Sequence, residues 1–271
     1  MYLPSGVPDQ KSYLRLIRTH SFRAIEHYSN SFIKKNKALL TGYSRKWTGD
    51  PLHQWSRQWE YPFVAQVIQR TKGTTNILDA GSGITFFPYF LASQNRRATI
   101  TCFDSDAMLR NMFQRVESDE KSQVKFMQGQ LEKTSFRDKS FDLIYCVSVL
   151  EHSKQVRDIL LEFYRILKPQ GKLILTFDIS LDGDGDISLN RARHLLTFLQ
   201  KTFPKYKLAQ QNPLNRLSIK NAVTTHFIAS LNAKLLPWRH PILSKIQSFL
   251  RFRFSLSLYK KLTFSCVVAQ K

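Results

Sequence analysis

The strongest constraint on the fold is the segment from residue 77 to residue 91, where an apolar run opens into a glycine-rich turn. Ile77-Leu78-Asp79-Ala80 predicts a buried strand, and Gly81-Ser82-Gly83 follows it directly. The apolar run 86–91 predicts that a helix comes next. Because glycine lacks a Cβ, the backbone of such a turn can approach a ligand closely. This order of strand, turn and helix favours a site for a nucleoside-type ligand.

A second acidic residue stands where a ribose would need it. The apolar run 98–103 predicts a strand that ends at Asp104, 21 residues after Gly83. A carboxylate at this point, about 20 residues past the turn, suits the two ribose hydroxyls. The dinucleotide fingerprint requires a glycine three residues after Gly83, where this chain has Phe86. The spacing therefore predicts a nucleoside site but argues against NAD.

Strands and helices continue to alternate along the chain. Further strands are expected at 124–127, 141–147, 172–177, 206–209 and 264–269, which brings the total to about seven. An apolar helix over 159–167 should end at Lys168-Pro169-Gln170-Gly171, since proline and glycine commonly follow a helix. This alternation predicts an α/β fold with a doubly wound, mostly parallel sheet.

Four stretches give the chain a resemblance to a known family. They are LDAGSG at 78–83, Asp104, FRDKSFDLIYCVSVLEH at 136–152 and LLEFYRILKPQGKLILTFD at 160–178. In order and spacing, residues 73–180 resemble the class I S-adenosylmethionine-dependent methyltransferases, in the small-molecule (type 11) branch related to the ubiquinone and menaquinone methylases. The chain departs from that pattern at Thr85, often a glycine, and at Gln130, usually an acid. A glutamine carbonyl accepts the same hydrogen bond from adenine.

The resemblance implies S-adenosyl-L-methionine as cofactor, S-adenosyl-L-homocysteine as product, and a Rossmann-like sheet with an antiparallel last strand. The residues that it implies for cofactor binding are Asp79, Gly81, Ser82, Gly83, Asp104, Ser105, Gln130, Leu131, Cys146 and Val147. The catalytic candidates are His152, Glu151 and Asp178, which follow or end the fourth and fifth strands. His152 is the preferred base, and a framework role is its alternative.

The flanks of this core suggest two additions. Helices expected near 12–40 and 54–71 would form an N-terminal helical lid over 1–72, before a methyltransferase domain over 73–271. Helices near 219–236 and 241–252 would form a helical insertion, 213–261, over the active site. Trp59 and Tyr61 are expected to contact the substrate, with burial in the core as the alternative.

Asp182, in the loop after the fifth strand, is also expected to bind the substrate. The structural alternative is that Ser188 caps a helix over 189–202 and that the neighbouring acids favour its positive end. The pattern of acids in this loop does not fit a calcium-binding EF-hand, which needs a glycine where the chain has Ile187.

The net charge of +21 is concentrated at the two ends of the chain. Residues 1–72 hold 12 Lys and Arg against 4 acids, and residues 181–271 hold 15 against 3, whereas residues 73–180 are nearly neutral. A solvated charged face is the default interpretation, and contact with a membrane surface or a polyanion is the alternative. Methylases of this class that act on the amino groups of DNA and RNA bases carry Asn/Asp-Pro-Pro-aromatic where this chain has Cys146-Val147-Ser148-Val149, which argues against methylation of base amino groups.

The remaining features favour a cytoplasmic protein. Cys102, Cys146 and Cys266 lie in expected strands without metal-binding spacing, so we expect buried thiols and no metal. The sequence has no apolar run long enough to span a membrane and no secretion signal at its start. It leaves the oligomeric state open.

Together these features predict a methyltransferase that acts on a small molecule. Because acids gather at the carboxyl edge of the expected sheet, we favour N-methylation of a small amine or guanidine over O-methylation. Two other classes stay open: an RNA or polyanion methyltransferase that uses the basic flanks, and a non-catalytic binding protein on the same fold.

Overall fold

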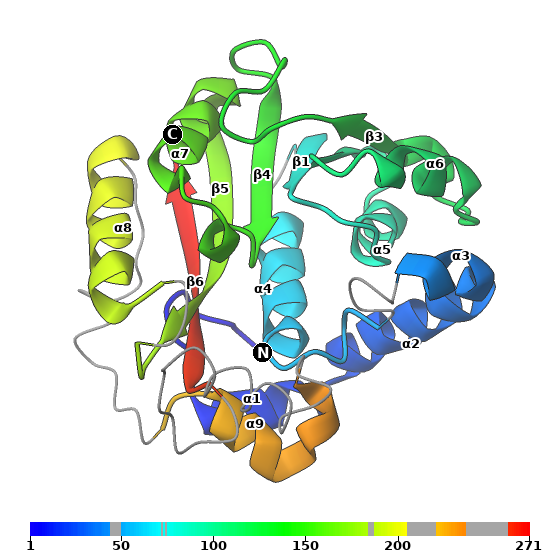
Figure 1. The fold of residues 1–271 in the computed structure, drawn as a ribbon. Helices are drawn as coiled ribbons and strands as arrows, with labels where there is room; N and C mark the ends of the chain where they lie inside the picture. Colours follow the sequence, from blue (N-terminus) through cyan, green and yellow to red (C-terminus); the bar gives the residue numbers. More distant parts are fainter. Residues whose placement is uncertain (44–49, 72, 74, 184–186, 205–220, 237–259) are drawn as a thin grey trace, which may run out of the picture.

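The computed structural model describes residues 1–271 except 44–49, 72, 74, 184–186, 205–220 and 237–259 (Figure 1). Its strands are β1 (Asn76–Ala80), β2 (Thr99–Asp104), β3 (Val124–Gln128), β4 (Phe141–Val147), β5 (Leu167–Ser180) and β6 (Leu262–Gln270). Its α-helices are α1 (Gln10–Leu16), α2 (His20–Lys35), α3 (Lys37–Tyr43), α4 (Arg57–Gln69), α5 (Phe87–Gln94), α6 (Met108–Arg115), α7 (Val156–Ile166), α8 (Leu189–Thr202) and α9 (Thr225–Asn232). Short 3-10 turns are η1 (Lys121–Gln123), η2 (Leu150–His152) and η3 (Ala233–Leu235).

The strands form one sheet in the order β3-β2-β1-β4-β5-β6. The first five are parallel, and β6 runs antiparallel to β5, with Asp178 opposite Phe264. The Rossmann-like fold and its antiparallel last strand are therefore confirmed. The expected count of about seven strands is wrong for the described residues, which form six. The strand expected at 206–209 lies outside them.

Helices cover both faces of the sheet, as an α/β layer structure requires. One core packs α4, α5 and α6 against the sheet, and the other packs α7 and α8 against the opposite face. Alternate residues of β4 supply the two cores: Tyr145 belongs to the first, while Ile144 and Cys146 belong to the second. Both faces of the central strands are buried, which explains why their sequences are continuously apolar.

The helices near the N-terminus and α9 lie beyond the carboxyl ends of the parallel strands (Figure 1). The single helix expected over 12–40 is instead three helices. Thr19 interrupts it because its side chain caps α2 by accepting a hydrogen bond from the Phe22 N–H, at 3.2 Å. Of the two helices expected in the insertion, α9 lies within 219–236, and 241–252 is outside the described residues. The division into lid, domain and insertion stays a prediction.

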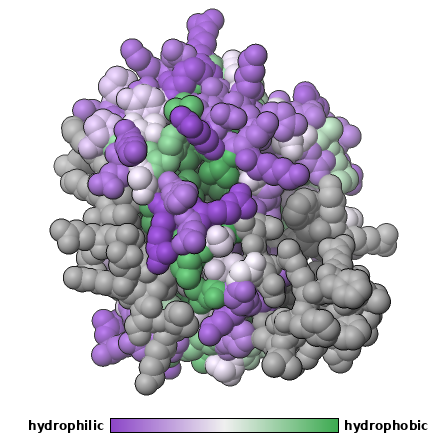
Figure 2. All heavy atoms as spheres, turned by 60° about the vertical axis from the view of Figure 1, so that its left-hand side comes forward, coloured by the Kyte–Doolittle hydropathy of each residue, from purple (hydrophilic) through white to green (hydrophobic). Residues whose placement is uncertain are grey.

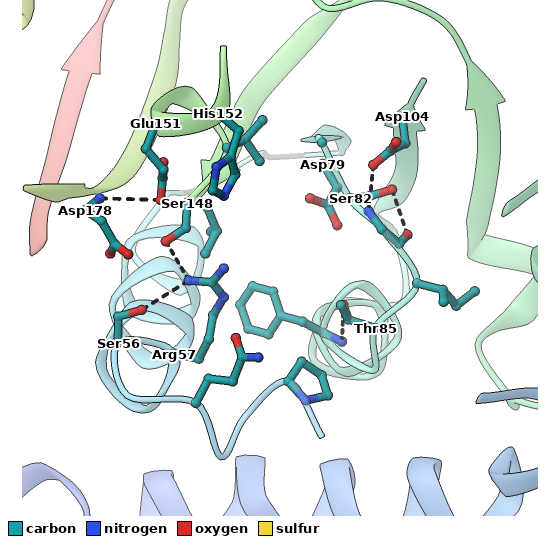
Figure 3. A pocket seen from close by; sticks show the side chains of 18 of the residues that line it. Ser56, Arg57, Asp79, Ser82, Thr85, Asp104, Ser148, Glu151, His152 and Asp178 are labelled. Carbon is teal, nitrogen blue, oxygen red and sulfur yellow. Dashed lines mark hydrogen bonds between the residues drawn. The ribbon is translucent and has the colours of Figure 1, made fainter. Parts of the chain in front are cut away.

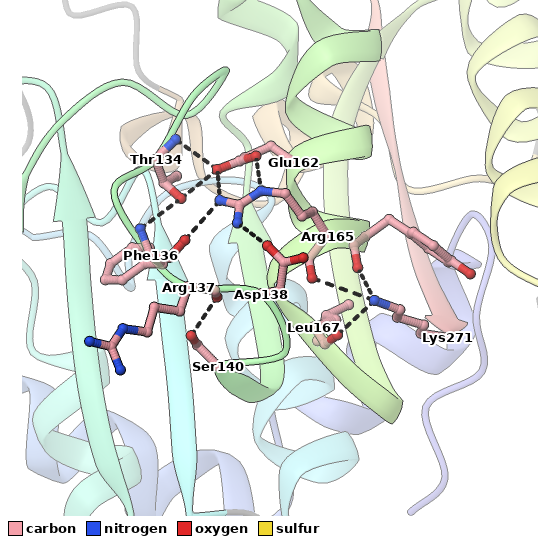
Figure 4. A network of polar contacts seen from close by, with 10 residues as sticks. Thr134, Phe136, Arg137, Asp138, Ser140, Glu162, Arg165, Leu167 and Lys271 are labelled. Atoms are coloured by element: carbon pink, nitrogen blue, oxygen red, sulfur yellow. Dashed lines mark hydrogen bonds and ion pairs between the residues drawn. The ribbon is translucent and has the colours of Figure 1, made fainter.

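A polar network fastens the segment between β3 and β4 to α7 (Figure 4). Arg165 on α7 donates to Asp138 at 2.5 Å and, through two nitrogens, to Glu162 at 2.7 and 2.8 Å. Thr134 donates to Glu162 through both its N–H and its hydroxyl. Lys271 Nζ donates to the carbonyl oxygens of Tyr164 and Leu167, where the last carbonyls of α7 lack helical partners.

We expect Arg165→Met to lower the free energy of unfolding by about 1–3 kcal/mol, because Glu162 would lose its charged partner. Burial alone would raise the pKa of Glu162, but the bonds from Arg165 and Thr134 hold it below its ordinary value. This contribution is fully present above the unfolded pKa, about 4.5, and is lost as the pH falls through the lowered folded value.

Urea denaturation of wild type and Arg165→Met at pH 7 and pH 3 measures both effects. Arg110→Met, an exposed arginine of α6, is the control and should cost less than about 0.5 kcal/mol. An equal cost for the two variants at pH 7 would contradict the structural role of Arg165.

Candidate functional site

A cavity of about 1520 Å³ lies at the carboxyl edge of the sheet, and α3, α4 and the segment around η3 contribute to its walls. Small-molecule sites are commonly about 300–1,000 Å³, so this cavity has room for a cofactor and a second small molecule. Its polar residues form two groups (Figure 3). Asp79, Ser82 and Asp104 lie at one end, and Arg57, Ser148, Glu151 and Asp178 lie at the other.

The glycine turn after β1 forms the wall of the first end. Gly81 and Gly83 have φ values of +73° and +53°, which side chains other than glycine rarely adopt. A Cβ on Gly81 would lie 2.5 Å from Val149 Cγ2, and one on Gly83 would lie 2.7 Å from the Tyr43 hydroxyl. The Gly81 N–H donates to the Phe103 carbonyl at 2.8 Å and so fixes the turn beside the end of β2. Only glycine fits this turn, as the sequence pattern predicts.

Asp104 at the end of β2 connects the turn to the predicted ribose site. Its Oδ2 accepts from the Gly83 N–H at 2.9 Å, and its Oδ1 accepts from the Asp106 N–H at 3.0 Å. Each carboxylate oxygen can accept a second hydrogen bond, so ribose hydroxyls can still bind. The glycine cradle and this carboxylate fit S-adenosylmethionine. Asp79, the acid of the motif, is buried, and burial raises its pKa to about 8.

Most of the residues predicted to bind the cofactor line this cavity. Those that do are Asp79, Gly81, Ser82, Gly83, Asp104, Ser105, Gln130, Leu131 and Val147. Cys146 is the exception: it is buried in the core on the opposite face of the sheet, because successive residues of a strand point to opposite faces. Their individual roles stay predictions.

A buried ion pair forms the second end. Glu60 on α4 has no exposed surface, and its carboxylate accepts from Arg57 and from the Ser148 hydroxyl, the latter at 2.9 Å. Arg57 also donates to Ser148 Oγ at 2.5 Å. Burial would lower the pKa of Arg57, but the Glu60 carboxylate raises it above its ordinary value. The sequence analysis did not single out Arg57, although its i,i+3 spacing from Glu60 is the usual signal of a helical ion pair.

Ser148 holds an uncommon backbone conformation at the end of β4. Its φ is +50°, and non-glycine residues with such values often occur at functional sites. The Ser148 N–H donates to the Thr176 carbonyl at 3.0 Å, and the hydroxyl joins Arg57 to Glu60. These bonds hold the serine in place, so it links β4 and β5 to α4.

The three predicted catalytic residues all line the cavity. Glu151 is buried: its Oε1 accepts from the Asp178 N–H at 3.4 Å, while its Oε2 has no hydrogen-bond partner among the described residues. Burial, together with repulsion from Glu60, raises the pKa of Glu151 to about 8. Asp178 is half-buried and His152 is exposed. Of the three predicted catalytic residues, Glu151 is therefore the most buried, and its Oε2 can still accept a proton or a hydrogen bond.

The three residues predicted to contact the substrate differ in their position relative to the cavity. Tyr61 lines the cavity and stacks on Phe87, with ring centroids 4.3 Å apart. Trp59 is buried in the core and does not line the cavity, because the face of α4 that carries Arg57 also carries positions i+3 and i+4 but not i+2.

Asp182 is exposed and lies outside the described cavity wall. It accepts from the Ser180 hydroxyl at 3.0 Å and the Lys261 N–H at 2.7 Å, so it ties the end of β5 to the start of β6. The capping role expected for Ser188 is confirmed, since its side chain accepts from the Arg191 N–H.

The described cavity wall is acidic although the chain is strongly basic. Its acids are Asp50, Asp79, Asp104, Asp106, Glu132, Glu151 and Asp178, and its lysines and arginines are Arg57, Lys234 and Lys260. Hydrophilic side chains of either sign cover much of the face shown in Figure 2, among the residues that are not grey. The raised pKa values keep Asp79 and Glu151 largely protonated at pH 7, so the five other acids supply most of the negative charge that a cationic ligand would meet in this wall.

The described residues offer neither a metal site nor a membrane-spanning helix. They contain no cluster of three or more His, Cys, Asp or Glu side chains that could hold a metal ion. No helix in that part of the chain combines the length and apolar character needed to span a bilayer. The three cysteines are buried and free, as expected.

Comparisons with known proteins agree with this geometry. A family profile described as a methyltransferase domain matches residues 78–175. A tRNA U34 carboxymethyltransferase from Nautilia profundicola is 29% identical over 119 residues, 44% of this chain and 39% of that protein. A sterol 24-C-methyltransferase from Neurospora crassa is 39% identical over 49 residues, 18% of this chain and 13% of that protein. The matched parts span well under half the length of either relative.

Solved structures share the fold at low identity. Phospholethanolamine N-methyltransferase 2 from Haemonchus contortus, solved with S-adenosylhomocysteine, has a TM-score of 0.55 at 15% identity, over 92% of this chain and 59% of that one. The cyclase SpnF has a TM-score of 0.53 at 16% identity, over 98% of both chains. Fold and glycine cradle thus define an α/β domain of the methyltransferase type. Residues 78–175 of the chain match a methyltransferase domain, and S-adenosylmethionine is the cofactor of the class I methyltransferases that this part of the chain resembles.

We expect Asp104→Ala to weaken the binding of S-adenosylhomocysteine by at least about tenfold, because two ribose hydrogen bonds and the bond to the Gly83 N–H are lost. Isothermal titration calorimetry measures this change. Asp119→Ala, an exposed acid, is the matched control and should bind like wild type. Unchanged binding by Asp104→Ala would show that the ribose lies elsewhere.

His53, in the wall of the cavity, should contribute to the free energy of unfolding at neutral pH and lose that contribution at alkaline pH. It contacts Asp50 at 2.8 Å and Glu26 at 3.1 Å, and the bond to Asp50 raises its pKa to about 9 despite partial burial. Because the folded pKa is raised above 6.5, the contribution is full below pH 6.5 and is lost as the pH rises through about 9.

Thermal unfolding of wild type and His53→Gln from pH 6 to pH 10 tests this dependence. Other groups titrate in the same range, so the difference between the two proteins is the relevant quantity. We expect that difference to be largest near pH 6 and to shrink towards pH 10. A difference that is constant with pH would contradict the charged role of His53.

Proposed function

We propose that this protein transfers a methyl group from S-adenosylmethionine to the nitrogen of a small amine or guanidine. The observation that carries the proposal is the acidic second end of the cavity, where Glu151 and Asp178 accompany the Arg57–Glu60 pair. Carboxylates hold cationic nitrogen by charge-assisted hydrogen bonds, which are the stronger kind. A neutral phenol has no positive charge for these carboxylates to bind.

S-adenosylmethionine would supply a methyl group on a sulfonium, whose sulfur is a good leaving group because it departs as a neutral thioether. The main work of the protein is to position the acceptor and exclude water. Tyr61, Phe87 and Tyr145 contribute a set of contacting aromatic rings to the cavity wall. That wall supports an in-line approach of an acceptor nitrogen to the cofactor end.

An amine must be neutral when it attacks, so an ammonium acceptor must first give up a proton. We assign this proton to Glu151, whose Oε2 is buried in the cavity wall and has no partner among the described residues. With a pKa of about 8, roughly a tenth of Glu151 is ionised at pH 7, and this ionised form can accept the proton. His152 lines the same cavity and is the alternative base.

The similarity to a tRNA U34 carboxymethyltransferase favours RNA as the second candidate substrate. The basic flanks of the chain suit a polyanion, but the described wall of the cavity carries more than twice as many acids as lysines and arginines. Phosphate-driven binding weakens steeply with salt, whereas methylation of a small amine should change little between 50 and about 200 mM salt. Salt dependence of turnover therefore separates the two candidates.

The test is a screen of amines, guanidines, phenols and carboxylic acids, with formation of S-adenosylhomocysteine as the readout. We expect an amine or guanidine to be the best acceptor. Glu151→Gln should reduce its turnover by about 10²-fold, since the variant cannot accept a proton. Asp178→Asn should mainly raise KM, and Asp158→Asn, an exposed acid of α7, is the control. A phenol or carboxylic acid as best acceptor would refute the proposal.

A further inference from the structure

We infer that the acceptor is a small amino carboxylate, with its carboxylate held by Arg57 and its amine held by Glu151 and Asp178. This inference rests on the proposed N-methylation and names the substrate class of the same cavity. The observation behind it is that one wall presents a cation and carboxylates side by side (Figure 3).

Arg57 has hydrogen-bond donors left for a ligand. Each of its contacts with the described residues, to Ser56, Glu60 and Ser148, runs through Nη1. A guanidinium carries five N–H donors, so those on Nε and Nη2 remain. The side chain lines the cavity and keeps 18% of its surface exposed, while its partner Glu60 keeps none. The donors that remain can therefore reach a ligand in the cavity, and a guanidinium binds carboxylates with two parallel bonds.

Glu151 offers the opposite chemistry in the same wall. Its Oε2 is buried and has no hydrogen-bond partner among the described residues, and such an atom is costly unless a ligand supplies a donor. Asp178 follows on the neighbouring strand, where its N–H donates to Glu151 Oε1. An ammonium group has the donors and the charge that the Glu151 carboxylate needs, and the negative charge of Asp178 lies close by.

Arg57 lies close enough to Glu151 and Asp178 for their charges to act on it. A simple amine here would satisfy Glu151 but would be repelled by Arg57. A simple carboxylate would satisfy Arg57 but would be repelled by Glu151 and Asp178. A molecule that carries both an ammonium and a carboxylate can pair with Glu151 and with Arg57. Because its net charge is zero, its burial adds no unpaired charge to the cavity.

Matched pairs of ligands test this inference on the protein loaded with S-adenosylhomocysteine. The pairs are glycine and methylamine, β-alanine and ethylamine, and γ-aminobutyrate and propylamine, which differ by the carboxylate alone. Calorimetry gives the ratio of affinities within each pair, and turnover with S-adenosylmethionine gives the ratio of kcat/KM. For at least one pair we expect the amino carboxylate to be favoured at least about tenfold.

Two variants isolate the guanidinium. Arg57→Met alone would leave Glu60 buried without its charged partner and could prevent folding. The comparison is therefore between Glu60→Gln and Arg57→Met/Glu60→Gln, which share the neutral residue at position 60. Glu60→Gln should keep the preference for the carboxylate, and the double variant should reduce it to within about twofold while S-adenosylhomocysteine binds as before.

Each outcome has a distinct meaning. Amines methylated or bound without a carboxylate preference would overturn this inference and leave N-methylation standing. A double variant that loses affinity for S-adenosylhomocysteine and keeps the preference would assign Arg57 to the cofactor and overturn it too. Amino carboxylates that bind preferentially but are never methylated would uphold the ligand class and refute the proposed activity.

Discussion

The carboxylate of Glu60, which has no exposed surface, is the constraint on which the site depends. A buried charge persists only when it is paired and hydrogen-bonded, and removing one partner of such a pair costs about 3–5 kcal/mol. Arg57 and Ser148 both donate hydrogen bonds to this carboxylate. Ser148 has a positive φ, and its hydrogen bonds to Thr176 help to hold that conformation. The need to neutralise one acid thus fixes α4 against the ends of β4 and β5. The same need brings a guanidinium into the cavity wall.

Sequence patterns could predict the sheet and the cofactor end because both follow from local rules. A buried strand needs a continuous apolar run, and the turn at Gly81 needs a residue that tolerates positive φ. A few adjacent residues are therefore enough to predict each of them. The acceptor end was only partly predictable, since its residues meet across distances that no local pattern encodes: Arg57 and Ser148 are 91 positions apart. Trp59 shows the related limit, because the local sequence does not say which face of α4 meets the cavity.

The distribution of charge separates what the surface does from what the cavity does. A net charge of +21 would repel a cation at long range, but salt screens exposed charges beyond about 8 Å at physiological ionic strength. Inside the cavity the nearest charges dominate, and in the described wall most of them are acidic. A ligand without net charge approaches such a protein without penalty and still finds both a cation and carboxylates at the site. The basic surface and the acidic cavity are therefore compatible with one small, zwitterionic acceptor.

On the proposed function, the residues that choose the acceptor lie largely outside the part of the chain that matches the family. The profile covers 78–175, which includes the glycine turn, Asp104, Ser148 and Glu151. Arg57 and Glu60 precede it and Asp178 follows it, so the guanidinium and two of the three carboxylates lie beyond the matched stretch. Structural neighbours with this fold include a protein described as a cyclase as well as methyltransferases, which shows that the shared core alone does not determine the chemistry. The specificity of this protein must therefore be sought in how α4 meets the ends of β4 and β5.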